Sequence, residues 1–234
     1  MIRTILILSL TFTNICLFAQ DIARRQPTDN AAVEYLQAVG SRSALYYGKI
    51  QDAHMRASNH PYLADAQYAK ARLSYFGVIY PEALLRMDLS RDELVVLSPE
   101  FQNIVLSPEN VDFAELHGKT VIYFTRDSLL GCPATGYYML LHSGKCKVME
   151  KKTAVLALEN NSYQYSFSFK TNYYLKKDDV YYTIRNKKGL LKILHPYKKE
   201  LKQFISNANL QFRYDAPEFI RKTVSEYEKL SGSL

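Results

Sequence analysis

Residues 163–185 read YQYSFSFKTNYYLKKDDVYYTIR, and this stretch decides the fold class. Aromatic and small polar side chains alternate along 163–170, and aromatic residues recur in the next two runs, 172–176 and 180–185. Alternation with a period of two is typical of β-strands that are buried on one face. An Asp-Asp pair separates the last two runs, and aspartate favours turns because its side chain bonds the nearby backbone. The stretch therefore predicts consecutive antiparallel strands.

Similar short apolar or alternating runs continue upstream and are separated by turn signals. They lie at 70–80, 83–89, 93–98, 103–107, 111–116, 119–125, 136–141 and 145–151. Strands at this regular, short spacing indicate an antiparallel meander, sandwich or barrel, because parallel βαβ units need longer crossovers. We expect a mainly β protein (β-rich α+β): an extended antiparallel meander or partly closed barrel, with the sheet over about 44–185.

Helical periodicity occurs at both ends of this region. Residues 29–39 predict a short N-terminal helix, followed by a strand over 45–52 and a loop over 56–65. After residue 186 the chain is rich in lysine, and its apolar residues recur at helical spacing. We expect C-terminal helices at 187–194, 198–208 and 217–230, a helical part of about 187–231 that packs on the sheet.

The first 20 residues have the parts of a secretory signal. Arg3 precedes an apolar stretch over 5–18, and Ala19 is a small residue at the expected cleavage site. We expect cleavage after Ala19 or Gln20, with a retained anchor as the alternative, and a single β-rich domain over 21–234. The rest of the chain has no run of 18 apolar residues, so we expect that it does not span a membrane after signal cleavage. The expected location is the periplasm, the cell envelope or the medium.

Two cysteines, Cys132 and Cys146, would remain after cleavage. The predicted strand between them, 136–141, spans roughly 20 Å. A disulfide tolerates about 7 Å between its α-carbons. We therefore predict two free, mostly buried thiols rather than a bridge.

Charge is divided unevenly along the chain. Residues 21–144 carry 11 Lys or Arg and 14 Asp or Glu, whereas residues 145–234 carry 18 and 9. The basic half is compatible with solvated helix faces or with an anionic partner such as phospholipid headgroups or polysaccharide. Nucleic acid is not an expected partner, because the chain has an export signal and no recognition motif.

Catalytic motifs are missing from the sequence, so we do not expect an enzyme, a cofactor or a metal site. The acidic pairs Asp92-Glu93 and Asp178-Asp179 could serve acid/base chemistry or bind Ca²⁺, but their position between strands favours turns. The fold could still assemble a cysteine nucleophile. The residues for it are Cys132 or Cys146 with His60, His142 or His195.

Candidate ligand-binding residues lie on one predicted strand face. Tyr163, Tyr165, Phe167 and Phe169 share that face, and Tyr182 on the next strand could extend it. Such a face is either ordinary core beneath the C-terminal helices or the lining of an apolar pocket. A pocket of this kind would take an acyl chain or another elongated apolar ligand.

Three longer runs carry a resemblance. GYYMLLHSGKCKVMEKK (136–152), NYYLKKDDVYYTIRNKKGLLKIL (172–194) and KKELKQFISNANLQF (198–212) together resemble uncharacterised exported proteins of the Gram-negative envelope. The resemblance covers about residues 136–212 and implies an envelope location. It carries no activity and no functional residues.

Together these features favour an exported, non-enzymatic envelope protein. Its expected partner is a lipid or other hydrophobic or amphipathic ligand, or an envelope protein. The alternative is a structural or scaffold component of the envelope with no small-molecule site. A hydrolase with a spatially assembled site is the third hypothesis.

Overall fold

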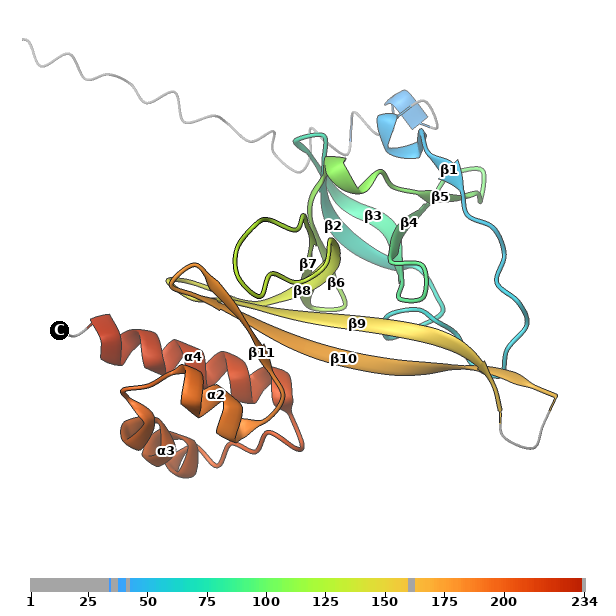
Figure 1. The fold of residues 1–234 in the computed structure, drawn as a ribbon. Helices are drawn as coiled ribbons and strands as arrows, with labels where there is room; N and C mark the ends of the chain where they lie inside the picture. The colour runs from blue at the N-terminus through green and yellow to red at the C-terminus, as the bar shows by residue number, and fades with distance from the viewer. Residues whose placement is uncertain (1–33, 35–37, 41–42, 160–162, 233–234) are drawn as a thin grey trace, which may run out of the picture.

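Eleven strands and three helices make up most of the chain that the structure describes, residues 34, 38–40, 43–159 and 163–232 of a computed structural model (Figure 1). The strands are β1 (Lys49–Ile50), β2 (Ala69–Tyr75), β3 (Val78–Asp88), β4 (Glu93–Leu97), β5 (Asn103–Val105), β6 (Val111–Leu116), β7 (Lys119–Phe124), β8 (Gly136–Ser143), β9 (Lys147–Leu158), β10 (Tyr165–Lys177) and β11 (Val180–Ile184). The helices are α2 (Lys187–Ile193), α3 (Lys198–Asn207) and α4 (Ala216–Gly232). All strands belong to one antiparallel sheet in the order β1-β5-β4-β3-β2-β6-β7-β8-β9-β10-β11.

The expected fold class is confirmed: the chain is a β-rich meander followed by C-terminal helices. The run at 70–80 is two strands rather than one, because Phe76 and Gly77 both have positive φ (53° and 71°). Positive φ at two central residues makes a tight hairpin turn whose twist matches that of the strands. Conversely, the runs at 163–170 and 172–176, which the sequence predicts as two strands, contribute to the single strand β10.

The N-terminal predictions are only partly tested. The segment predicted to be an export signal and most of the helix predicted over 29–39 lie outside the described residues. The strand expected over 45–52 is reduced to β1, because residues 44–46 form a 3₁₀ turn that Ser43 caps. Residues 56–65 form a loop as expected, apart from one bridge between Tyr62 and Asp88.

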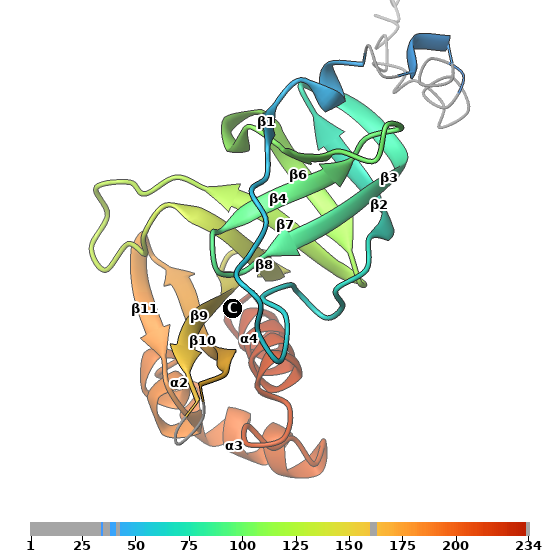
Figure 2. The same cartoon turned by 90° about the vertical axis from the view of Figure 1, so that its right-hand side faces the viewer.

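The sheet curls around an interior but does not close into a barrel (Figure 2). Bulges interrupt the β2–β3, β2–β6 and β8–β9 ladders, and a bulge increases local twist and bends a strand. The curl brings the end of β3 to β9, where the Ala154 N–H donates to the Leu89 carbonyl (3.0 Å). Lys151 reinforces this corner, since its Nζ donates to Asp92 Oδ1 (2.6 Å) and to the Tyr137 carbonyl (2.9 Å). A side chain on Gly136 would collide with Asp92 Oδ2 at 2.1 Å, which explains the glycine here.

The side chains on the two faces of the sheet pack into three apolar cores. The largest lies inside the curl and includes Leu73, Leu85 and Met139. A second lies under the helices and includes Val148 and Leu175 from the sheet. The neighbours of these residues point to the other face, where Tyr138, Met149 and Tyr174 form the third core.

The helices cover one end of β8, β9, β10 and β11 (Figure 1). In α4 the residues of the predicted stripe, Phe219, Ile220, Val224 and Tyr227, are buried against this end of the sheet. A stripe at this spacing buries one face of a helix and leaves the other in water. None of the helices in the described residues is long and apolar enough to cross a membrane.

Glu228 on α4 holds the β8–β9 hairpin against the helix. Its Oε1 accepts the backbone N–H of Cys146 (2.6 Å), and its Oε2 lies 3.0 Å from His142 Nε2 without hydrogen-bond alignment. Cys146 is buried, and burial followed by the nearby Glu228 carboxylate raises the pKa of its thiol to about 11. Cys132, half-buried, is also free, so the predicted free thiols are confirmed.

We predict that Cys146 stays unreactive in the folded protein. A thiol must ionise before it attacks a disulfide reagent, and near pH 8 a thiol with a pKa of about 11 is almost fully protonated. In a C132S variant of residues 21–234, which lack Cys16, reaction with a chromogenic disulfide should be slow, should accelerate as the pH rises towards 11, and should become fast on unfolding in urea. Rapid stoichiometric labelling of native protein near pH 8 would contradict the burial described here.

Candidate functional site

The most unusual part of the sheet is a two-stranded arm, which we define as residues 151–158 of β9 and 165–172 of β10. β8 pairs with β9 only as far as Glu150, and β11 pairs with β10 only from Tyr173 onward. Among the described strands the arm therefore has no neighbour on either side, and it projects beyond the curled sheet (Figure 1). An isolated hairpin is marginally stable in water, so contacts from outside the hairpin must support it.

Three of the five predicted aromatic residues, Tyr165, Phe167 and Phe169, lie on the arm, but the five do not form one buried surface. Phe167 is 5% exposed and belongs to the core inside the curl, not to the core beneath the helices. Phe169 on the same face is 53% exposed, Tyr165 is partly exposed and Tyr163 is fully exposed. Tyr182 lies on β11 opposite Leu175, eight strand positions from Phe167, or roughly 26 Å away. The structure thus brings Tyr165, Phe167 and Phe169 together and leaves Tyr182 apart.

The outer edge of β10 is open along part of the arm. The backbone N–H and C=O of Phe167 point away from β9, because both bond the side chain of Asn59 (2.7 and 2.9 Å). Backbone direction alternates along a strand, so Phe169 and Thr171 point their N–H and C=O groups to the same edge. Within the described residues no hydrogen bond reaches these groups. The open edge is therefore a row of unpaired donors and acceptors beside the exposed Phe169 ring.

A strap, which we define as residues 51–60, follows β1 to the outer half of the arm, where it bonds Tyr165 and Phe167, and it is anchored by buried Asp88. Asp88 Oδ2 accepts from Gln51 Nε2 (3.0 Å) and lies 2.5 Å from His54 Nε2. Its Oδ1 accepts from the N–H and hydroxyl of Ser90 (2.9 and 2.8 Å) and from the Arg91 N–H (3.2 Å). The carboxylate is fully buried, and its polar contacts satisfy both of its oxygens.

Between the strap and the arm lies the strap cleft, with a volume of about 420 Å³. Phe167, Leu156 and Ala154 supply an apolar wall, and Arg91 is its charged lining residue. The His54 ring stands edge-on to Phe167 at 5.6 Å between centroids. The cleft lining is Ala53, His54, Met55, Ser90, Arg91, Ala154, Val155, Leu156 and Phe167. Its size lies within the range of small-ligand sites, and its chemistry suits an apolar molecule with one anionic group.

The strap cleft does not contain the geometry of a serine nucleophile. In a Ser-His-Asp arrangement the serine hydroxyl bonds the imidazole and the imidazole bonds the carboxylate. Here the Ser90 hydroxyl and His54 both contact the Asp88 carboxylate. These contacts anchor the strap rather than activate Ser90.

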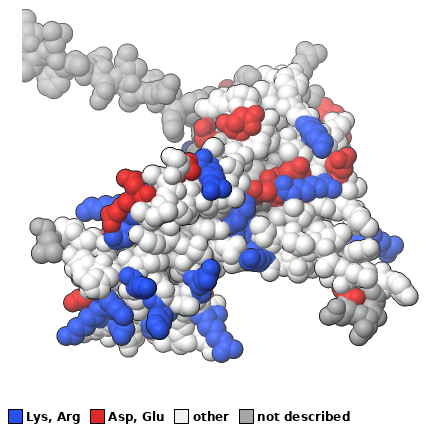
Figure 3. Space-filling model, viewed as in Figure 1, with Lys and Arg blue, Asp and Glu red and all other residues white. Residues whose placement is uncertain are grey.

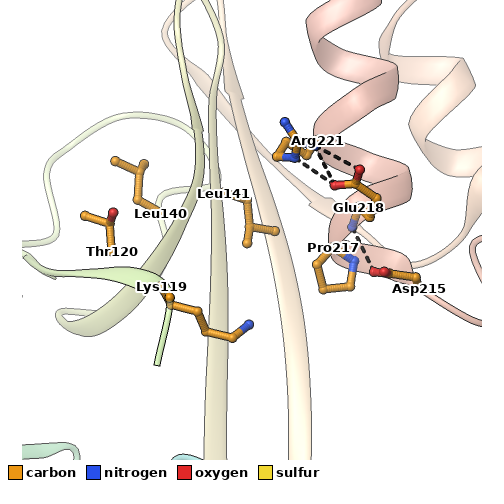
Figure 4. A pocket seen from close by; sticks show the side chains of 9 residues that line it. Lys119, Thr120, Leu140, Leu141, Asp215, Pro217, Glu218 and Arg221 are labelled. Carbon is orange, nitrogen blue, oxygen red and sulfur yellow. Dashed lines mark hydrogen bonds and ion pairs between the residues drawn. The ribbon is translucent and has the colours of Figure 1, made fainter. Parts of the chain in front are cut away.

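A second cleft of about 410 Å³ separates β7 and β8 from the start of α4 (Figure 4). Lys119 reaches into it, and its Nζ lies 3.3 Å from Oε2 of the buried Glu150. On the helix side the Glu218 carboxylate accepts from Arg221 Nε (2.8 Å), and that bond is the main cause of its lowered pKa. Asp215 Oδ1 accepts the Glu218 N–H and caps the helix (2.9 Å). Lys119 is paired with Glu150, and Arg221 with Glu218, so both cationic side chains of the cleft already have an acidic partner and we interpret the cleft as a joint between the sheet and the helix.

The other candidate chemistry from the sequence is not assembled into a reactive site. Asp92 and both aspartates of Asp178-Asp179 adopt positive φ (50–57°) in hairpin turns, as their turn interpretation predicts. His142 and Cys146 do share Glu228, but burial keeps the Cys146 thiol protonated. No group of three or more His, Cys, Asp or Glu in the described residues is placed to hold a metal ion.

The open edge and the Asp88 anchor were not predicted from the sequence. Asp88 is the penultimate residue of the apolar run at 83–89. The Ser-Arg-Asp that follows this run signals a turn but not the strap, whose His54 lies 34 residues earlier in the chain. No family model, curated protein or solved structure matches this chain.

We predict that Asp88→Asn destabilises the protein by roughly 2–4 kcal/mol. An amide keeps one acceptor but turns an NH₂ group towards the donors on Gln51 or Ser90, which leaves a buried donor unpaired. Urea unfolding should show a lower midpoint with an unchanged slope. Asp52→Asn on the same strap is the matched control, since Asp52 is exposed in a surface ion pair and should matter little. Equal stability of the two variants would contradict the anchoring role of Asp88.

Proposed function

We propose that this chain is an exported, non-enzymatic envelope protein that binds a partner protein through its arm. The observation that carries the proposal is the open edge of β10 at Phe169 and Thr171 beside an exposed aromatic ring. The binding mode is addition of an extended partner segment to that edge, with backbone hydrogen bonds for affinity and side-chain contacts for specificity.

The strap supports an extended polypeptide as the occupant. The Ser58 N–H donates to the Tyr165 carbonyl (2.8 Å), and Asn59 bonds Phe167 on the same edge. The chain itself thus already uses the first half of this edge for strand-like contacts. A partner segment would continue the same hydrogen-bond row between the strap and β11.

Side chains on the arm support an apolar contact rather than a purely polar one. Val155, Leu158 and Phe169 are more than half exposed. Exposed apolar side chains that cluster on one projection mark interaction surfaces more often than isolated ones do. Lys170 on the edge strand opposes uncontrolled strand pairing, because a charged side chain disfavours edge-to-edge aggregation.

We predict that Thr171→Pro abolishes partner binding while Thr171→Ala retains it. Proline removes the outward N–H and blocks strand addition, yet an edge position tolerates it. A photoreactive phenylalanine analogue at position 169 in cells would identify the partner, and titration of that purified partner would compare the two variants. We expect Thr171→Pro to lower the affinity for the partner at least tenfold. The circular dichroism spectra of both variants should match that of the wild-type protein.

Equal affinity of the proline variant would exclude strand addition at this edge. Crosslinking of the analogue to a second copy of the chain would replace the partner protein with self-association, which light scattering would reveal. Crosslinking to lipid alone would favour the ligand-binding alternative.

A small amphipathic ligand in the strap cleft is the second candidate. The apolar wall of Phe167 and Leu156 faces a rim that carries Arg91, which suits an acyl chain with a carboxylate. Met55 lines the same cleft and is 60% exposed, so it can be changed without disturbing the core.

We predict that calorimetry detects binding of dodecanoate, used below its micelle concentration, to wild-type protein and to Met55→Leu. Met55→Asp should bind more weakly, because it places a carboxylate beside the acyl chain and opposes the ligand's own charge. Absence of dodecanoate binding by the folded wild-type protein would exclude this candidate and leave the arm proposal unaffected.

A further inference from the structure

The segment between β11 and α4 carries a dense group of basic side chains. Residues 185–213 contain eight Lys or Arg and a single acid, Glu200. The basic patch consists of Arg185, Lys187, Lys188, Lys192, Lys198, Lys199, Lys202 and Arg213. All eight are exposed, and none forms an ion pair within the described chain.

Elsewhere in the protein, basic side chains are repeatedly matched by acids. Lys70 pairs with Glu82, Lys151 with Asp92, and Arg221 and Lys222 with Glu218. The ion pairs stop at the start of the basic patch and resume on α4. Uneven pairing of this kind leaves a local positive potential that the fold itself does not neutralise.

The fold gathers the patch on one surface. Leu190 and Leu191 of α2 and Leu201 and Ile205 of α3 point into the same apolar core, so the lysines of both helices point outward. Figure 3 shows Lys and Arg side chains gathered over these helices, with few acids among them. The arm lies at the other end of the molecule (Figure 1).

The shape of the patch favours an extended anionic surface over a small anion. None of its eight residues lines the strap cleft or the cleft of Figure 4. None lines two further clefts of about 380 and 260 Å³ either. Six of the eight are lysines, which act as point charges, whereas bidentate recognition of individual phosphates favours arginine. Non-specific attraction to a charged surface needs only clustered charge.

An aromatic side chain accompanies the basic patch. Tyr214 follows Arg213 in the turn between α3 and α4 and is 79% exposed. Tyrosine is enriched at the level of lipid headgroups, because its ring is apolar and its hydroxyl is polar. Clustered lysines with a neighbouring exposed tyrosine match the chemistry of a membrane interface.

We propose that the basic patch binds the surface of an anionic phospholipid membrane. The helices would lie against the headgroups without crossing the bilayer, and the arm would point away from them. This inference concerns a different surface from the arm and is tested without any partner protein.

The test compares residues 21–234 with two triple variants in sedimentation with vesicles. Lys198, Lys199 and Lys202 are changed to Gln in the patch variant. The matched control changes Lys49, Lys70 and Lys229 to Gln, three lysines of similar exposure (72%, 68% and 70%) that lie outside the patch. Both variants lose the same net charge, so a difference between them reports the location of the charge rather than its amount.

We expect binding to vesicles of phosphatidylcholine with phosphatidylglycerol, and none to phosphatidylcholine alone. The patch variant should bind roughly 100-fold more weakly and the control within about threefold of wild type, given the attraction of each lysine to an anionic surface. Tyr214→Ser should weaken vesicle binding several-fold yet leave binding to soluble polyphosphate unchanged. Thr171→Pro should leave vesicle binding intact, which separates this inference from the arm.

Three outcomes would overturn the proposal. Failure of the folded wild-type protein to bind anionic vesicles at low salt would identify the patch as a solvated face. Equal losses in both triple variants would attribute binding to net charge. Tighter binding to a nucleic acid oligomer or to heparin than to vesicles would assign the patch to a different polyanion.

Discussion

The buried carboxylate of Asp88 is the constraint on which the arrangement of the sheet depends. It lies where β3 ends, and it contacts donors from the following turn and from the strap, which enters from far earlier in the chain. A buried charge is tolerated only when its lone pairs are satisfied, so the turn and the strap must keep their places together. The Leu89 carbonyl next to this carboxylate then bonds Ala154, which connects the same corner to the arm.

The corner explains why the sheet curls without closing. Bulges supply the bend, and the Asp92–Lys151 ion pair with its bond to the Tyr137 carbonyl holds the bent ends together. A complete ladder between β3 and β9 is not needed, because side chains and one backbone hydrogen bond make the connection. The arm continues past the corner as a ribbon, and this leaves the edge at Phe169 uncovered.

Local patterns in the sequence were sufficient to predict most strands and all three C-terminal helices. Alternation identifies a strand and the side chains that share a face, as at Phe167 and Phe169, because the pleat has a period of two. It does not reveal what covers that face: Phe167 is buried because residues far upstream fold over it, and Phe169 lies just beyond their reach. Likewise, the sequence itself shows that the C-terminal segment is rich in lysine. It does not show that those lysines lack ion pairs, because ion pairs depend on tertiary neighbours.

The continuity of β10 has a mechanical consequence. Its thirteen residues run without a break from the arm to the apolar core under the helices, a distance of roughly 40 Å. There is no glycine or proline within the strand to act as a hinge. The strap bonds β10 at Tyr165 and Phe167, and Leu175 of the same strand lies in the core under the helices, so one unbroken strand links the strap mechanically to the helices.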